Sequence, residues 1–235
     1  MISGLQKMTL LDYPGKVACT IFTQGCNFRC PFCHNSDLLG KEGPETIPVE
    51  TLMAFLKKRV GLLDAVCITG GEPTLQPGLE DLIKEIKALG YLVKLDTNGT
   101  RPEVIKSLAE KKLIDYVAMD IKNSPEKYGA TAGVPNMHLE RIEESIKYLL
   151  AGNVAYEFRT TVADELHEPE DFTAIGAWLQ TLDPDHKAAK FFIQPYVDRD
   201  SVLAPGLHTP TREKLLKMRS AIAPHTSGAE IRGMD

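Results

Sequence analysis

Three cysteines lie within eight residues of one another near the start of the chain. They are Cys26, Cys30 and Cys33, in the spacing Cys-x3-Cys-x2-Cys. Thiolates this close in one loop can converge on one metal centre, and iron–sulfur clusters are normally held by four cysteines. The other two cysteines, Cys19 and Cys67, fall in apolar runs and are interpreted as small buried hydrophobic residues. A cluster with three protein ligands leaves one iron open, which is typical of a catalytic metal centre.

The alternative for this loop is a structural zinc site in which His34 is the fourth ligand. Zinc sites usually pair two short ligand elements that are separated by a longer spacer. His34 directly follows Cys33 and could not easily complete a tetrahedron with it. We therefore favour the iron–sulfur interpretation.

The elements that must position this loop alternate between two kinds of segment. Short apolar runs rich in β-branched residues predict buried strands, and longer segments with apolar residues at helical spacing predict helices. The predicted strands are 17–23, 65–69, 92–95, 114–119, 154–162, 190–193 and 229–232, and the predicted helices are 49–60, 79–89, 102–111, 139–150, 168–181 and 209–222.

Repeated alternation of strand and helix implies a parallel sheet with helices on its outer face. About six such units are too few for the usual eight-stranded barrel. The sequence therefore predicts an α/β fold, a partial (β/α)6 barrel, with an open doubly wound sheet as the alternative. The cysteine loop follows the first predicted strand, and ligands bind at the carboxyl ends of strands in such folds.

Composition limits the classes of function. Hydrophobic residues make up 43% of the 235 residues and charged residues 25%, as in ordinary globular proteins, and we expect one domain over residues 1–235. The net charge of −5 argues against a general nucleic-acid binder. The sequence predicts neither a membrane span nor a signal peptide, and its odd number of cysteines gives no disulfide framework. We expect a cytoplasmic protein without nucleic-acid or membrane partners.

The cysteine loop resembles the signature of the radical S-adenosylmethionine (radical SAM) superfamily, Cys-x3-Cys-x-aromatic-Cys, with Phe32 as the aromatic residue. Residues 27–35 as a whole are similar to the branch that activates glycyl-radical enzymes. The resemblance implies one 4Fe–4S cluster, held by the three cysteines, whose open iron is chelated by the amino and carboxylate groups of S-adenosylmethionine. One electron then cleaves the sulfonium bond and yields a 5′-deoxyadenosyl radical.

The same resemblance assigns cofactor contacts. Phe32 would pack near the adenine, and Gly70-Gly71-Glu72-Pro73 would bind the methionine amino group, although a plain turn is the alternative. Asp96 and Asn98 would face the ribose or methionine end; the alternative, which does not exclude this role, is an Asn-Gly turn that Asp96 and Thr97 cap. The full predicted set of cofactor-binding residues is Phe32, His34, Gly70, Gly71, Glu72, Pro73, Asp96, Asn98, Asp120, Lys122, Arg159 and Gln194.

Charged residues at two later strands complete this picture. Asp120 and Lys122 are two apart on an extended segment, so they point the same way, and Asp120 would orient Lys122 toward the cofactor carboxylate. The alternative is a solvent-exposed ion pair. Arg159 lies within a predicted strand and is expected to face inward toward the same carboxylate. Five scattered histidines are predicted to be solvated or to cap helices: His138, His167, His186, His208 and His225.

The segment Gln194-Pro195-Tyr196-Val197 indicates the subfamily. Activases of pyruvate formate-lyase tend to show Leu-Pro-Tyr-His here, so this chain departs from them at Gln194 and Val197. Together with Leu5-Gln6-Lys7 and the segment 12–16, this is similar to the activating proteins of anaerobic ribonucleoside-triphosphate reductase.

The resemblance therefore predicts an activase that removes a hydrogen atom from a backbone glycine of a partner enzyme. Since the chain carries no further cysteine-rich insertion, flavodoxin or ferredoxin would supply the electron. Three alternatives stay open: a pyruvate formate-lyase-type activase, a small-molecule enzyme like the 7-carboxy-7-deazaguanine synthases, and a non-catalytic metal-binding module. The last predicts that the Gly-Gly-Glu, Asp-x-Lys and Arg159 features have no common focus.

Overall fold

The computed structural model describes residues 2–40, 46–199 and 201–234. Two compact units can be distinguished by their internal contacts. The first comprises Met1–Asn27, Asp37–Thr97 and Glu103–Ala118, and the second comprises Phe28–Ser36, Asn98–Pro102 and Met119–Asp235. The expectation that residues 1–235 form a single domain stays a prediction.

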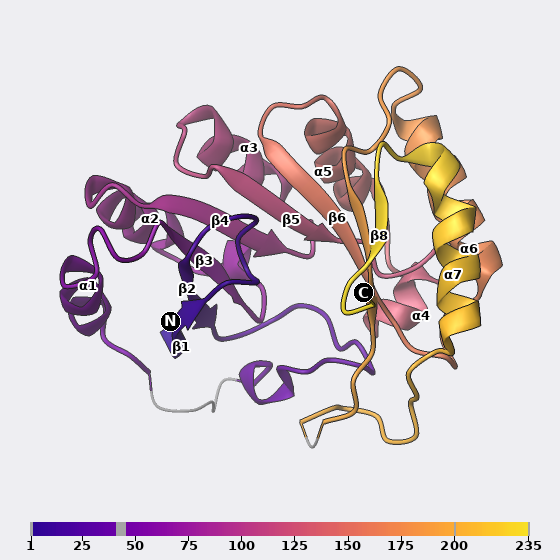
Figure 1. Cartoon of the computed structure of the whole chain (residues 1–235), viewed down its shortest axis with the longest axis horizontal. Coiled ribbons are helices and arrows are strands. Elements are labelled where there is room, and N and C mark those ends of the chain that lie inside the picture. Colours follow the sequence, from indigo (N-terminus) through magenta and orange to yellow (C-terminus); the bar gives the residue numbers. More distant parts are fainter. Residues whose placement is uncertain (1, 41–45, 200, 235) are drawn as a thin grey trace. The chain divides into compact units, whose positions relative to one another are not determined.

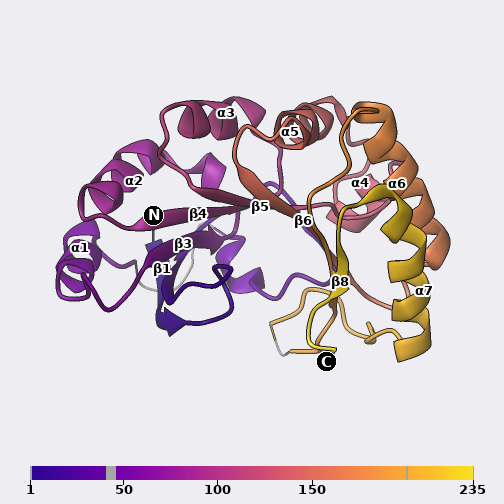
Figure 2. The same ribbon diagram turned by 45° about the horizontal axis from the view of Figure 1, so that its top comes forward.

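The first unit is built on four strands that are hydrogen-bonded in sequence order. An antiparallel pairing joins β1 to β2, and parallel pairings join β2 to β3 and β3 to β4. Helices α1, α2 and α3 lie along one side of β3 and β4 (Figures 1 and 2). The bounds are β1 Ile2–Thr9, β2 Ala18–Thr23, β3 Ala65–Gly70, β4 Leu92–Thr97, α1 Val49–Lys57, α2 Leu79–Ala88 and α3 Pro102–Glu110, with 3-10 turns η1 Ser36–Leu38 and η2 Pro73–Leu75.

The second unit has parallel strands in the order β6-β7-β8, and β5 begins in the first unit and ends in the second. Its core is aromatic: Phe172 of α6 packs edge-on against Phe191 of β7. The bounds are β5 Tyr116–Asp120, β6 Ala155–Val162, β7 Phe191–Pro195, β8 Ala229–Ile231, α4 Tyr128–Ala132, α5 Glu140–Leu150, α6 Pro169–Leu182, α7 Arg212–Ile222 and the 3-10 turn η3 Ala223–His225.

This element order confirms the predicted fold class, an α/β partial (β/α)6 barrel with parallel strands. From β2 to α7 the chain runs through six strand–helix units. A doubly wound sheet reverses its strand order at a switch point, whereas the strands of each unit follow sequence order. Among the described residues, no helix combines the length and apolarity needed to cross a membrane.

Two elements were not predicted, and one helix begins later than predicted. Strand β1 has exposed residues, and its pairing with β2 has two register shifts. Its sequence therefore shows no continuous apolar run from which a strand could be predicted. Helix α4 is only five residues long and ends at Gly133, which has a φ of +67°. Helix α7 begins at Arg212 and not at Thr209, because the Thr211 hydroxyl accepts the Lys214 N–H and caps the helix.

Candidate functional site

The cysteine loop follows β2, and its ligand candidates are divided between the units. Cys26 belongs to the first unit, and Cys30 and Cys33 to the second. None of the five cysteines, all of which lie in the described residues, is in a disulfide. The Cys33 N–H donates to the Cys30 carbonyl at 3.0 Å and closes a turn around Phe32. Among the described residues, no three His, Cys, Asp or Glu side chains are already arranged around a metal position.

Helix α4 and the segment 201–204 seat the second half of this loop. The Arg29 N–H donates to the Ala132 carbonyl at 2.9 Å, and the Ala204 N–H donates to the Pro31 carbonyl at 3.0 Å. A Cβ on Gly133 would clash with the Arg29 carbonyl, so α4 can lie against the loop only where a glycine ends it. The Ser201 hydroxyl adds a hydrogen bond of 2.7 Å to the His34 carbonyl.

The thiols of the second unit are buried or half-buried and lie near charged groups. Burial raises the pKa of the Cys33 thiol, and Asp120 adds to this rise, which the Asn35 N–H and the charges of Lys122 and Arg29 offset only in part. Cations of this kind stabilise a thiolate, which is the form that binds iron. The donor set therefore fits an iron–sulfur cluster: three thiols in one loop that are not in disulfides, with Cys30 and Cys33 in reach of positive charge.

In the first unit the Gly-Gly-Glu-Pro motif is fixed by close backbone contacts. The Gly71 N–H donates to the Thr23 carbonyl and the Glu72 N–H to the Gly25 carbonyl, both at 2.8 Å. A Cβ on Gly70 would clash with the Thr23 backbone, and one on Gly71 with the Gly25 carbonyl. The two glycines thus hold the segment that leads into Cys26.

The Glu72 side chain is 1% exposed and accepts hydrogen bonds within its own unit. Its Oε1 accepts from the Thr74 N–H at 3.0 Å and hydroxyl at 2.5 Å, and from the Thr97 hydroxyl at 2.8 Å. Glu72 therefore caps η2, in which Pro73 is the first residue, and ties it to the end of β4. A contact of these residues with the cofactor stays a prediction.

Asp96 and Asn98, at the end of β4, differ in their surroundings. Asp96 forms an ion pair with Lys94, which is 1% exposed. The Asn98 Oδ1 accepts from the Thr100 N–H at 3.1 Å and from its hydroxyl at 2.7 Å. The φ of +78° at Gly99 agrees with the turn that the sequence predicts at Asn98-Gly99. The predicted caps are wrong: Asn98 itself caps the turn, whereas Asp96 pairs with Lys94 and Thr97 donates to Glu72.

Asp120, Lys122 and Arg159 form one ion cluster in the second unit. The Asp120 carboxylate lies 3.0 Å from Lys122 Nζ and 3.1 Å from Arg159 Nε. The prediction that Asp120 and Lys122 point the same way is confirmed. The solvent-exposed alternative is wrong, because the Lys122 side chain is 13% exposed and that of Arg159 is 11% exposed. The sequence did not show that Asp120 is an anion partner of Arg159 as well.

The pKa values of Asp120 and Lys122 in this cluster are strongly shifted. Burial alone would raise the pKa of Asp120, but Lys122 and Arg159 outweigh it and lower that pKa to about 2. Burial alone would lower the pKa of Lys122, but Asp120 and the Cys30 thiol outweigh it and raise that pKa. Both groups are therefore charged at neutral pH, and the three side chains together carry a net charge of +1.

Phe32, His34 and Gln194 belong to the second unit. Phe32 is buried, and its ring centroid lies 6.1 Å from that of His167. His34 stacks on Tyr196, and its Nε2 lies 2.8 Å from the Val197 carbonyl. Nε2 donates to that carbonyl, so only Nδ1 of this ring could bind a metal. Gln194 is half-buried on β7, opposite Thr161 of β6.

His167 contradicts the prediction that it is solvated or caps a helix, because it is fully buried. Its only sequence signal is its place one residue before Glu168, the N-cap of α6, in the loop that follows β6. His138, His186 and His208 are exposed, as predicted. His225 is half-buried beside Gln180.

Comparisons with known proteins identify the family. Residues 20–164 match the model of the radical SAM superfamily. A protein of Methanocaldococcus jannaschii, named for a glycyl-radical enzyme activating enzyme, is 36% identical over 78% of this chain and 77% of its own length. A pyruvate formate-lyase-activating enzyme of Staphylococcus epidermidis is 28% identical over 83% of this chain and 80% of its own length.

Solved structures share the fold. A domain of a pyruvate-formate lyase-activating enzyme from Bacteroides vulgatus aligns with a TM-score of 0.58 and 22% identity, over 72% of this chain and 99% of that one. Streptococcus suis SuiB aligns with a TM-score of 0.69 and 14% identity over 91% of this chain, which spans only 48% of SuiB.

Proposed function

The chain belongs to the radical SAM superfamily and to its glycyl-radical-enzyme activating branch, and we propose that its partner is anaerobic ribonucleoside-triphosphate reductase. The observation that carries this choice is Val197. Where pyruvate formate-lyase activases tend to have a histidine, this chain has a valine that is 52% exposed, and His34 contacts its carbonyl. The side chain at position 197 therefore has no polar group that could contact an adenine.

The family uses a 4Fe–4S cluster and S-adenosylmethionine, which together supply a 5′-deoxyadenosyl radical when bound. We propose that Cys26, Cys30 and Cys33 hold the cluster. Their spacing, the absence of disulfides at these cysteines and the positive charge of Lys122 and Arg29 beside Cys33 support this assignment.

The ion cluster supplies the charge that an anionic ligand needs. Asp120 holds Lys122 and Arg159 in place, and the net charge of +1 suits a carboxylate such as that of S-adenosylmethionine. We propose this role for the cluster, and cofactor contacts for Phe32, His34, Gly70, Gly71, Glu72, Pro73, Asp96, Asn98 and Gln194. Asp120 joins two of the three features, Asp-x-Lys and Arg159, which supports an enzyme over a non-catalytic module. For the reductant we propose flavodoxin or ferredoxin.

A pyruvate formate-lyase-type activase is the second candidate. It is favoured by the 28% identity with the Staphylococcus epidermidis enzyme over most of both chains. The exposed Val197 side chain argues against it.

The two candidates differ in the partner that they activate. The protein is reconstituted anaerobically with iron and sulfide, reduced, and mixed with S-adenosylmethionine and either anaerobic ribonucleotide reductase or pyruvate formate-lyase. We expect a glycyl-radical doublet in the electron paramagnetic resonance (EPR) spectrum with the reductase. A doublet only with pyruvate formate-lyase would reverse the choice of partner.

Two cysteine variants complete this test. Cys30→Ala should abolish cluster binding and the doublet. Cys67→Ala is the matched control, because Cys67 is buried in β3 and is not a proposed ligand. A doublet from Cys30→Ala would contradict the ligand assignment.

A further inference from the structure

His167 is a fully buried histidine whose two ring nitrogens both have partners. Its Nε2 lies 2.9 Å from the Lys122 carbonyl, and its Nδ1 lies 3.3 Å from both the N–H and the carbonyl of Ala163. A carbonyl only accepts, so Nε2 carries the proton and Nδ1 accepts from Ala163. In this neutral form the ring joins the loop after β6 to the loop after β5, and burial lowers its pKa in agreement.

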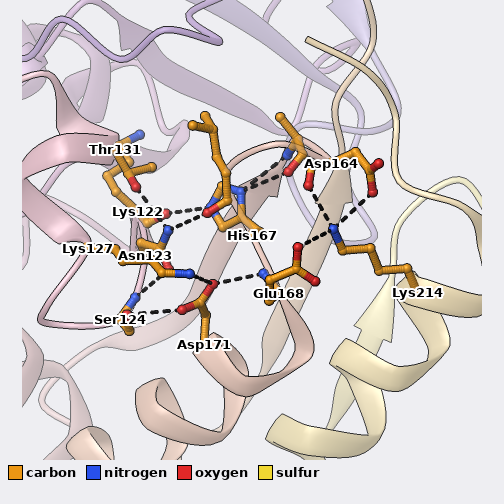
Figure 3. A network of polar contacts seen from close by, with 12 residues as sticks. Lys122, Asn123, Ser124, Lys127, Thr131, Asp164, His167, Glu168, Asp171 and Lys214 are labelled. Carbon is orange, nitrogen blue, oxygen red and sulfur yellow. Dashed lines mark hydrogen bonds and ion pairs between the residues drawn. The ribbon is translucent and has the colours of Figure 1, made fainter.

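Asn123 and Asp171 reinforce the same junction (Figure 3). The Asn123 amide donates to the Leu166 carbonyl at 3.0 Å and to the Thr131 hydroxyl at 2.9 Å. Asp171 of α6 accepts from Lys127 Nζ and from the Glu168 N–H, both at 2.8 Å. The segment from Lys122 to α4 is therefore held from one side by the His167 loop and the start of α6.

The cysteine loop is held by this segment in turn. The Arg29 N–H bonds to the last residue of α4, as described above, and Lys122 acts electrostatically on Cys30. The His167 ring also lies 6.1 Å from the ring of Phe32, between Cys30 and Cys33. His167 thus reaches the cysteine loop by two routes, directly through Phe32 and indirectly through Lys122 and α4.

We propose that His167 is a positioning residue that holds Phe32 and the Lys122 segment, and so keeps the Cys30–Cys33 turn in its closed form. The inference rests on the proposed function, because this turn carries two of the proposed cluster ligands. Its test uses the iron-free protein without cofactor or partner. The inference can therefore fail while the proposed function stands, and the proposed function can fail while the inference stands.

The test measures how fast each cysteine of the reduced, iron-free protein is alkylated by iodoacetamide, read by mass spectrometry. Cys30 is 6% exposed, so its labelling requires the turn to open. The side chain that His167→Asn introduces is too short to reach Lys122. We expect iodoacetamide to label Cys30 about tenfold faster in this variant than in the wild type, as for a local opening that has lost one buried hydrogen bond. His167→Gln retains a donor toward Lys122 and should give an intermediate rate.

Three controls separate positioning from general loss of stability. Cys19 and Cys67 are fully buried in the first unit and should stay unlabelled in every variant. Lys214→Met removes ion pairs of 3.0 and 2.9 Å to Asp164 and Glu168. It weakens the same β6–α6 loop without touching Lys122 or Phe32, and it should leave Cys30 protected.

Each other outcome overturns the proposal. Unchanged Cys30 labelling in His167→Asn means that the ring does not hold the turn. Labelling of Cys19 and Cys67 at the same rate as Cys30 means that His167 supports the fold as a whole. Equal labelling of Cys30 in Lys214→Met means that any damage to the β6–α6 loop is enough to expose Cys30. If His167→Asn does not fold, the other two variants decide. The proposal is then wrong if Cys30 is labelled at the wild-type rate in His167→Gln and becomes exposed in Lys214→Met.

Discussion

The Gly70–Pro73 loop of the first unit and the ion cluster of the second unit both follow strand ends, but different forces hold them. The loop depends on backbone hydrogen bonds, on two glycines that allow close approach, and on the hydrogen bonds that the Glu72 carboxylate accepts. The cluster depends on the charges of Asp120, Lys122 and Arg159. Steric fit of this kind does not titrate, whereas an ion cluster does. The first region should therefore be sensitive to added atoms, and the second to pH.

The largest effect is expected from Gly71→Ala in the first region. The added Cβ would clash with the Gly25 carbonyl, which is backbone and cannot move aside cheaply. We expect a loss of about 3 kcal/mol in the free energy of unfolding of the iron-free protein, measured by urea denaturation. Gly228→Ala is the matched control, since its Cβ would meet only the Ala189 carbonyl, at 3.9 Å. Equal losses in the two variants would contradict the steric account.

Glu72→Ala should have the next largest effect. It leaves the Thr74 N–H and the Thr97 hydroxyl buried without their acceptor, at a cost of about 2 kcal/mol in unfolding free energy. Glu72→Gln keeps one acceptor oxygen and should lose about half as much. If both variants are as stable as the wild type, these bonds do not hold the loop.

A smaller effect, but a pH-dependent one, is expected from Asp120→Asn. Because the pKa of Asp120 is lowered from 3.8 to about 2 in the folded protein, ionised Asp120 stabilises the fold above pH 4. This stabilisation is lost as the pH falls from about 4 to about 2. The variant should be less stable by about 1 kcal/mol at pH 7, and the difference should vanish only below about pH 2. Iron-free protein unfolded by urea across this pH range would show it, and a difference that does not change with pH would refute it.

The smallest effect is expected from Lys217→Met on α7. The Lys217–Glu213 pair has side chains that are 63% and 78% exposed, so solvent screens it. We expect no measurable change in unfolding free energy, from the same urea measurement. A loss as large as that of Asp120→Asn would mean that burial does not distinguish the site cluster from a surface pair.

The sequence predicted the parts of this site that depend on local pattern. Period-two geometry placed Asp120 and Lys122 on one side of the chain, and the 3.0 Å ion pair confirms it. Clustered cysteines marked the loop that follows β2. Such features require only neighbours in the sequence.

Long-range partners could not be predicted in the same way. Glu72 accepts a hydrogen bond from Thr97, and His167 donates one to the Lys122 carbonyl, across 25 and 45 residues of sequence. Local pattern does not encode such pairings. This is why the sequence wrongly predicts that His167 is solvated or caps a helix. Helix α4 is too short to show helical periodicity, although it seats the cysteine loop.

The most direct test of the account is 5′-deoxyadenosine formation by the anaerobically reconstituted and reduced protein. The account predicts that the wild type and Cys67→Ala convert S-adenosylmethionine to 5′-deoxyadenosine, and that Cys30→Ala forms neither cluster nor product. Absence of cleavage from wild-type protein with a full cluster, or cleavage by Cys30→Ala, would contradict the assignment of the cysteine loop as the catalytic centre.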